Sequence, residues 1–470
     1  MMGSRRRNLM AGLLVAWGAS AHGAGLVLLE APKNLQLYPR GENGSATVRA
    51  RGTILVPGFD AVLAEAFRDG ERVASIQQAL RYHDGRAPFD LRHEIEAGLH
   101  SHDYSLSLLR GEERIPLGER SDVVCGDVLL IQGQSNAAAG DSHGEGLANR
   151  YQRPWIRSFG TPSVYPGEVR ADTAWCLADG ESWPVSGAVG AWGLRMAQLL
   201  MEAEGVPVAV LNGAVGATPI GWHLRDDAAP ENLATIYGRL LWRARRARLA
   251  AAARAIFWYQ GETNGTGNIR VYGEKFQDLH GDWHEDFPAL EHTYVIQFRA
   301  GCGGTPEETI PMRGLQGRAA DYFDDVETMS TTALHRHDGC HYYFTGYREL
   351  GERMARLVSR DLYGGTETEA ISAPRLVEVR QDRAREVRLV FPPEHRMRWD
   401  EGAGADFRVE GGAQVVGGRA EGNEIVLELD APRAVETVTY LGHPFDGPWV
   451  VNQRGIGILT FDRVAVSGLR

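Results

Sequence analysis

The pattern of hydrophobic and polar positions changes twice along the chain and divides it into three regions. Residues 26–120 carry apolar side chains at every second position between turn residues, as half-buried antiparallel strands do. The same alternation returns over residues 372–470. Between them, over residues 121–365, short continuous apolar runs alternate with stretches at helical spacing. We therefore expect an α/β domain flanked by N- and C-terminal β-sandwich domains.

The continuous apolar runs of the middle region predict strands that are buried on both faces of a parallel sheet. Strands are expected at 128–132, 206–212, 255–260, 293–298 and 326–330, and helices at 192–203, 233–253, 272–283, 312–322 and 344–358. This alternation predicts a doubly wound, mostly parallel sheet with right-handed crossovers. The helix expected at 233–253 carries five arginines, which we interpret as a solvated face.

The first 21 residues have the composition of a signal peptide. Three arginines, Arg5 to Arg7, precede an apolar stretch from Leu9 to Trp17, and Ala19-Ser20-Ala21 provides a cleavage site. The apolar stretch is too short to span a membrane comfortably, although a retained anchor is the alternative. We expect a secreted or periplasmic protein with no membrane anchor after cleavage.

Charge and cysteine content narrow the class of protein further. The net charge of −11, with no basic run interleaved with aromatic residues, argues against a nucleic-acid partner. Four cysteines without C-x-x-C spacing fit an exported protein with up to two disulfides, and they do not indicate a zinc ribbon. No sequence feature indicates an oligomeric state.

Ser135 is the candidate nucleophile. It follows the apolar run 128–131 in the sequence Gly133-Gln134-Ser135-Asn136, where glycine permits a sharp turn and a helix can begin. Open α/β sheets place their ligands at this end of a central strand. A capped helix without catalytic function is the alternative, so the prediction depends on partner residues elsewhere.

Those partners follow the other strands of the middle region. Residues 212–218, rich in glycine, and residues 258–264, which include Gln260, can supply hydrogen-bond donors to an oxyanion. His341 can act as a general base, and Asp338, three residues earlier, can orient its imidazole. The alternative for Asp338 and His341 is that they cap the helix that begins near Phe344.

Five motifs in this order resemble the sialate O-acetylesterase family, a carbohydrate-esterase branch of the SGNH hydrolases that also includes acetyl xylan esterases. They are GQSN, GATPIGW, WYQGETN, Arg313-x-x-Gln316 and DGCH, and the resemblance covers roughly residues 125–357. It implies an SGNH-type catalytic domain and an O-acetylated carbohydrate substrate, and we expect neither a metal nor a cofactor.

The resemblance also implies a role for each residue of the site. Ser135 would be the nucleophile, His341 the base and Asp338 its partner. The oxyanion hole would comprise the backbone N–H groups of Ser135 and Gly216 and the side chain of Gln260. The chain departs from the family pattern in carrying Ala137, Ala217 and Thr263 where Met, Gly and Ser are common.

Four further residues are candidates for substrate binding. Arg313 and Gln316 come from the helical motif of the resemblance. Trp222 can stack on a sugar ring or pack in the core. Glu262 can act as a second acid or accept hydrogen bonds from its own loop.

We expect a disulfide between Cys302 and Cys340. Cys302 follows the strand at 293–298 and Cys340 precedes His341, so both should lie at the carboxyl edge of the sheet. The alternative is that Cys302 and Cys340 are two buried free thiols. Cys125 and Cys176 would form the remaining pair.

Together these features predict a serine carbohydrate O-acetylesterase that works through an acyl-serine intermediate. The alternatives are an esterase for another acyl group and a non-catalytic carbohydrate-binding protein on the same scaffold.

Overall fold

The computed structural model describes residues 25–182 and 184–468. The predicted signal peptide, residues 1–21, lies outside the described residues. The chain divides into two compact units, one ending at Cys125 and the other beginning at Gly126. None of the described helices has the length and apolar character needed to cross a membrane.

The first unit contains two β-sheets that share hydrophobic cores. One sheet has the antiparallel order β1 (Leu26–Glu30), β3 (Ser45–Ile54), β6 (Ala87–Glu96). The other contains β2 (Leu37–Pro39), β4 (Ala61–Arg68), β5 (Glu71–Ala79), β7 (His102–Arg110) and the first part of β8 (Glu113–Gly133). The inward positions of β3 and β6, such as Ile54 and Leu91, pack against those of β4 and β7, such as Val62 and Leu106. On β3 and β6 the alternation in the sequence corresponds to one buried face and one more exposed face.

The second unit is built on a central sheet of parallel strands. Its order is β11 (Val208–Asn212), β8, β12 (Ala253–Tyr259), β13 (His292–Gln297), β14 (Val326–Ser330). All four of these pairings are parallel, and β8 contributes its residues from Asp127 onward. Beyond β11 lie β9 (Ile156–Phe159) and the antiparallel edge strand β10 (Trp175–Leu177).

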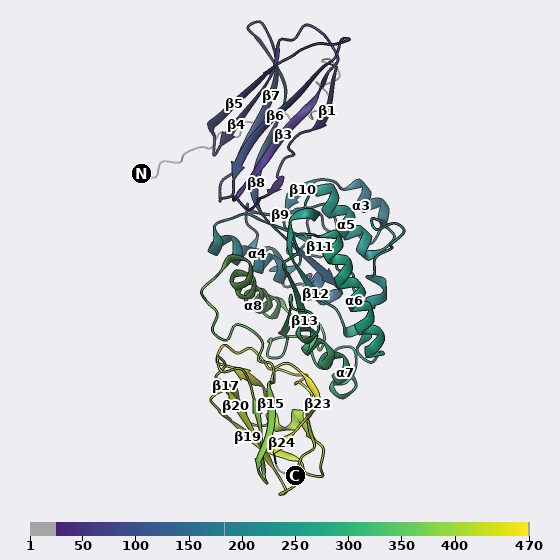
Figure 1. Cartoon of the computed structure of the whole chain (residues 1–470), viewed down its shortest axis with the longest axis vertical. Coiled ribbons are helices and arrows are strands. Elements are labelled where there is room, and N and C mark those ends of the chain that lie inside the picture. The colour runs from purple at the N-terminus through teal and green to yellow at the C-terminus, as the bar shows by residue number, and fades with distance from the viewer. Residues whose placement is uncertain (1–24, 183, 469–470) are drawn as a thin grey trace, which may run out of the picture. The chain divides into compact units, whose positions relative to one another are not determined.

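Helices cover both faces of this sheet. Figure 1 shows α4 (Ala191–Glu204) and α8 (Phe344–Tyr363) on one side and α5 (Ile236–Ala247) and α6 (Ile269–Asp286) on the other. The chain passes from β8 to β11 on one side of β8 and then crosses to β12 on the other side. This reversal of direction is the place where open α/β sheets bind ligands.

The five strands and five helices expected in the middle region are present, with shifts at their ends. The largest shifts are of six residues. Helix α5 ends at Ala247 in place of position 253, and α7 (Pro306–Gly317) begins six residues before the expected position because Thr305 and Glu308 form a capping box. The expected continuation of this helix is a separate 3₁₀ turn, Ala319–Asp321. The strands β9 and β10 were not predicted, because both are short and contain polar residues.

The arginine-rich helix α5 corrects one interpretation. Arg239 and Arg243 are buried, so the face that carries them is not solvated. The Arg243 guanidinium donates to the backbone oxygens of Phe159, Gly160 and Asn212, at the ends of β9 and β11. Burial lowers the pKa of Arg243 to about 10, and the group remains charged at neutral pH.

The C-terminal part of the second unit contains three small sheets. They have the orders β19 (Val415–Glu421), β20 (Glu424–Leu429), β16 (Glu386–Val390), β15 (Glu378–Arg383), β24 (Ser467–Gly468); β17 (Met397–Trp399), β22 (Val450–Asn452); and β18 (Phe407–Val409), β21 (Thr437–Tyr440), β23 (Phe461–Ala465). A single apolar cluster, including Val387, Leu427 and Tyr440, draws residues from all three sheets.

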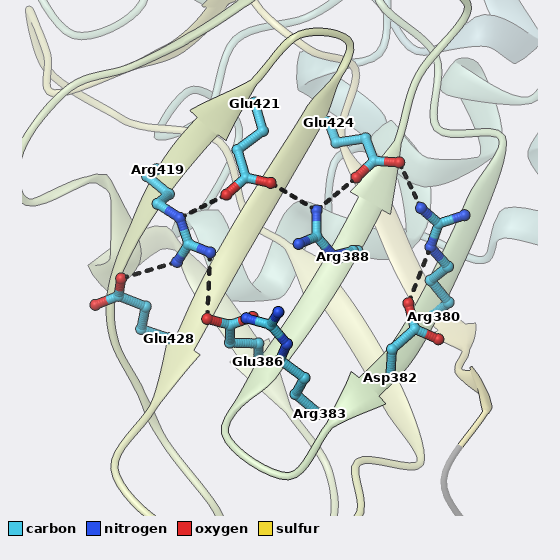
Figure 2. A network of polar contacts seen from close by, with 9 residues as sticks. All are labelled: Arg380, Asp382, Arg383, Glu386, Arg388, Arg419, Glu421, Glu424 and Glu428. Atoms are coloured by element: carbon cyan, nitrogen blue, oxygen red, sulfur yellow. Dashed lines mark hydrogen bonds and ion pairs between the residues drawn. The ribbon is translucent and has the colours of Figure 1, made fainter.

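The face of the five-stranded sheet opposite this cluster carries a ladder of ion pairs (Figure 2). Arg388 lies 2.8 Å from Glu421 and 2.7 Å from Glu424. Arg419 contacts Glu386 at 3.2 Å. Each exposed pair is worth little by itself, but charged side chains along β19 also discourage pairing of this edge strand with other chains.

Replacing Arg243 by Met should destabilise the fold by about 3 kcal/mol or more, because three buried carbonyl groups would lose their donor. Arg246→Met on the same helix is the matched control, since Arg246 is exposed. Denaturant unfolding of both variants measures the difference. Equal stability of the two would contradict the assignment of Arg243 as a structural link between β9 and β11.

Candidate active site

Ser135 lies where the central strand β8 ends and the one-turn helix α2 (Ser135–Ala138) begins. The turn is fixed by Gly133, whose φ of +145° and close approach to the Tyr259 backbone exclude a side chain. The Gln134 N–H donates to the Tyr259 oxygen at 2.9 Å, which joins the turn to the end of β12. Ser135 therefore lies at the carboxyl edge of the sheet, beside the reversal of strand order.

The structure brings Ser135, His341 and Asp338 together. His341 Nε2 lies 2.8 Å from Ser135 Oγ, although the two residues are 206 positions apart in the chain. His341 Nδ1 lies 3.6 Å from Asp338 Oδ2, which is an ion-pair distance and longer than a hydrogen bond. The arrangement places an imidazole between a hydroxyl and a carboxylate, as serine nucleophile activation requires.

The Asp338 carboxylate is held by its own loop. Its Oδ1 accepts hydrogen bonds from the N–H groups of Cys340 at 2.8 Å and His341 at 2.7 Å. Although partial burial opposes the shift, these two bonds lower the pKa of Asp338, so the group is ionised at neutral pH. A second histidine, His143, approaches the same carboxylate with Nε2 3.7 Å from Oδ2 and stacks on Tyr343.

Ser135 and Gly216 carry the two backbone N–H groups that are predicted to form the oxyanion hole. A Cβ built on Gly216 would lie 3.6 Å from Ser135 Cβ, so the Gly216 backbone is adjacent to the candidate nucleophile. Both residues line the same cavity. Within the described part of the chain, neither the Ser135 nor the Gly216 N–H donates a hydrogen bond. Both are therefore free to donate to a substrate oxygen.

The position of Gln260 corrects the prediction that it completes the oxyanion hole. Its side chain is fully buried, and Nε2 donates to Gln134 Oε1, the Thr218 oxygen and Asn264 Oδ1 at 3.2, 3.1 and 2.8 Å. Because protein acceptors use the amide N–H groups, Gln260 cannot also donate to a substrate. It ties the loops after β8, β11 and β12 to one another.

Glu262 lies behind the nucleophile in a buried polar network. Its Oε1 accepts from Asn136 Nδ2 at 2.9 Å, and its Oε2 has no hydrogen-bond partner among the described residues. Asn136 Nδ2 also donates to the Cys340 oxygen at 3.2 Å, and Asn136 Oδ1 accepts from the Tyr347 hydroxyl at 2.9 Å. Asn136 thus connects the nucleophile turn with the loop of the base, a role that the sequence analysis missed although the residue is part of GQSN.

The remaining substrate-binding candidates, Arg313, Gln316 and Trp222, differ in their burial. Arg313 is buried and donates to Thr460 Oγ1 at 2.8 Å and the Pro306 oxygen at 2.9 Å. Gln316 is buried and donates to the Gln260 oxygen at 2.7 Å. These contacts give Arg313 and Gln316 structural roles in place of the predicted substrate contact. Trp222 is 64% exposed, so core packing does not explain it.

The loop that carries His341 is fixed by several partners. Cys302 and Cys340 form the expected disulfide, with Cα atoms 4.8 Å apart. Arg299, two residues after β13, donates to the Gly339 oxygen and to His337 Nε2. His337 is therefore part of the support of this loop, and burial followed by the charge of Arg299 lowers its pKa.

The second expected disulfide is not formed. Cys125 lies in β8 and packs in an apolar cluster with residues such as Tyr38 and Val48. The Cys176 thiol, in β10, donates to the Ser158 oxygen at 3.5 Å, and burial raises its pKa to about 11. Both cysteines are thus reduced.

A cavity of about 310 Å³ opens at Ser135 and His341. Its walls combine small and polar residues: Ala138, Gly140, Asp141, Ser142, Val164, Glu181, Ser182, Ala214, Val215, Gly216 and Tyr347. Two of these residues are acidic, and among the described residues that line the cavity there is no lysine or arginine. The cavity therefore favours a small polar ligand that carries no negative charge.

The chain is similar to several known proteins. The family model described as carbohydrate esterase, sialic acid-specific acetylesterase matches residues 125–360. A carbohydrate acetylesterase structure from Xanthomonas citri matches with a TM-score of 0.64 and 19% identity, over 93% of this chain and 99% of that one. A family two carbohydrate esterase from Cellvibrio japonicus matches with a TM-score of 0.32 and 11% identity, over 72% and 96% of the two chains. No curated protein sequence matches this chain. The Xanthomonas structure has the same fold.

The buried carboxyl of Glu262 should make the fold less stable as pH rises. Burial raises its pKa from 4.5 to about 7, so the folded protein holds this proton more tightly than the unfolded chain does. The contribution of Glu262 to stability is then greatest at acid pH and is lost between those two values. Glu262→Gln should therefore be more stable than the wild type above pH 7, by up to about 3 kcal/mol, and equally stable near pH 4.

Denaturant unfolding of both proteins across this pH range measures the effect. Glu401→Gln, at an exposed carboxyl, is the control and should follow the wild type at every pH. A constant difference between Glu262→Gln and the wild type at all pH values would show that Glu262 does not titrate as described.

Proposed function

Because this chain belongs to the carbohydrate esterase family of sialic acid-specific acetylesterases, we propose that it removes acetyl groups from a carbohydrate through an acyl-serine intermediate. The observation that supports this most directly is the 2.8 Å contact between Ser135 Oγ and His341 Nε2 at the floor of a cavity. The family makes the chain a carboxylic ester hydrolase, and the contact supplies the pair that such a hydrolysis needs. We also propose that the central domain is SGNH-like and doubly wound.

The proposed reaction has two steps. Ser135 Oγ attacks the acetyl carbonyl carbon while its proton passes to His341 Nε2, and the oxyanion accepts hydrogen bonds from the Ser135 and Gly216 N–H groups. Collapse of this intermediate breaks the ester bond, and His341 returns the proton to the sugar hydroxyl that leaves. A water then gives a proton to His341 as it attacks the acyl carbonyl carbon, and collapse of this second intermediate breaks the bond to Ser135 Oγ, which takes the proton back from His341 as acetic acid leaves.

Asp338 is proposed to orient His341 during both steps. Its carboxylate is ionised at neutral pH and lies on the Nδ1 side of the ring, so it favours the Nδ1–H tautomer and stabilises the imidazolium that forms. The distance of 3.6 Å must shorten for a direct hydrogen bond, as catalytic contacts of a free enzyme often do when substrate binds.

The charge of the cavity favours a neutral sugar as the carrier of the acetyl group. Asp141 and Glu181 line the cavity, and no cationic side chain among the lining residues faces them. The carboxylate of a sialic acid would therefore lose hydration without gaining a partner. We propose that the substrate is an O-acetylated neutral saccharide, which differs from the sialic acid that the family description names.

We further propose that the protein is exported. Residues 1–21 have the composition of a signal peptide, and the Cys302–Cys340 disulfide suits an oxidising compartment.

Ser135→Ala should lower the hydrolysis of 4-nitrophenyl acetate by a factor of about 10⁴ or more, because it removes the nucleophile while leaving the oxyanion donors. Ser75→Ala, at an exposed position of β5, is the matched control. Acetate release from an acetylated glycan panel tests the carbohydrate part of the proposal. A Ser135→Ala variant that keeps most of its activity would overturn the mechanism, and a wild type without any esterase activity would support the non-catalytic alternative.

An O-acetylated sialic acid should be a poorer substrate than its own methyl ester, with kcat/KM lower by about tenfold, because the ester removes the charge that Asp141 and Glu181 repel. Asp141→Asn and Glu181→Gln should each reduce this difference. Steady-state kinetics on the two sugars measures it. Faster turnover of the free acid would contradict the proposed neutral specificity without affecting the Ser135 mechanism.

A further inference from the structure

We propose that His280, His284 and Asp325 form a binding site for one divalent transition-metal ion such as Zn²⁺. The residues lie outside the catalytic site, and the proposal departs from the expectation that the chain holds no metal. It depends on the geometry of three side chains and is independent of the function proposed for Ser135.

Two histidines one helical turn apart create the site. His280 and His284 lie on α6 at positions i and i+4, so both side chains leave the same face of the helix. Their ring centroids are 4.6 Å apart. This spacing is the one with which helices commonly present two imidazoles to a single ion.

Asp325 supplies the third group from a different element. It precedes β14, and its backbone oxygen accepts from the Thr293 N–H at 2.9 Å, which fixes it against β13. His280 Nε2 lies 2.9 and 3.1 Å from the two carboxylate oxygens, and His284 Nε2 lies 3.0 Å from Oδ2. All three ligand atoms lie within 4.8 Å of one another.

These distances suit a shared ion. Two ligand atoms that are each about 2.1 Å from a tetrahedral ion lie roughly 3.4 Å apart. The contacts of 2.9–3.1 Å with Asp325 would therefore lengthen by a few tenths of an ångström, and the two Nε2 atoms, which lie within 4.8 Å of each other, would both turn toward the ion. Each neutral imidazole would then bind through Nε2 as its Nδ1–H tautomer, and two imidazoles with one carboxylate are a donor set that suits Zn²⁺.

The surroundings leave a position for a fourth ligand. The side chain of His284 is 38% exposed and that of Asp325 is 22% exposed, so water can reach the site. The His280 ring is less exposed, at 12%, and packs against Phe323 with centroids 4.4 Å apart. One side of the cluster is therefore apolar and fixed, and the other is open to solvent.

An ion at this place would link α6 to the start of β14. Asp325 precedes a strand of the parallel sheet and Ser135 follows one, so the two residues lie at opposite edges of the sheet. The bound ion is therefore expected to stabilise the fold and to make no contribution to ester hydrolysis.

The test uses the full chain without a histidine tag, after treatment with a chelator and dialysis. Calorimetric titration with Zn²⁺ should show one binding step per chain, and the melting temperature should rise with Zn²⁺ concentration. Co²⁺ should give the intense visible absorption of a tetrahedral centre. Neither His284→Ala nor Asp325→Asn should show the Zn²⁺ binding step, the rise in melting temperature or the Co²⁺ absorption.

His83→Ala is the matched control, since His83 is 93% exposed and lies in the other unit. It should retain the binding step. Because His284 is on the surface of α6, its replacement should leave the fold intact, and circular dichroism without metal checks this. Absence of a one-to-one binding step in the wild type, or its persistence in both variants, would overturn the proposal and leave the cluster a hydrogen-bonded contact between α6 and β14.

Discussion

The position of β8 between β11 and β12 is the constraint on which the candidate site depends. Its last residues pair with both neighbours and are buried, so hydrogen bonds from two strands and packing on both faces hold the strand in place. The chain leaves β8 for one neighbour and later returns to the other, so the loops after β11 and β12 flank the turn that contains Ser135. A side chain at this turn is both rigidly held and accessible, two properties that a surface loop rarely combines.

Much of this frame could be predicted from local sequence. A continuous apolar run such as Val128 to Ile131 is compatible with few positions other than the interior of a parallel sheet. Once the order of elements is known, motifs that end successive strands must meet at one edge. This is why Ser135 and His341 could be paired across 206 residues. The choice of Gly216 within the loop after β11 came from the family resemblance, and the structure places Gly216 beside Ser135.

The failures have a common physical cause. Gln260 was expected to face substrate because an amide is a good donor, and Arg313 and Gln316 because they belong to a motif of the resemblance. The structure turns the donors of all three toward buried protein oxygens. A buried backbone carbonyl needs a donor as much as a substrate does. Which acceptor a side chain finds depends on residues such as Thr218 and Thr460, distant in sequence, and no local pattern encodes that choice. Arg243 was misjudged for the same reason.

The loop of His341 and the buried acid Glu262 are connected through one amide. Both N–H atoms of Asn136 Nδ2 have acceptors, one on Glu262 and one on the Cys340 backbone, and its oxygen accepts from Tyr347. An apolar residue at position 262 would leave one of those N–H groups unpaired in the interior, at a cost of about 1–3 kcal/mol. Glu262 thus supplies the oxygen atom that Asn136 requires as a hydrogen-bond acceptor at this position. The side chain of Cys340 is held by the disulfide to Cys302, and its backbone oxygen accepts a hydrogen bond from Asn136. The loop that carries His341 is therefore fixed both by a covalent bond and by a hydrogen-bonded network. The 2.8 Å contact with Ser135 is therefore set by the supports of the loop as much as by the two residues that make it.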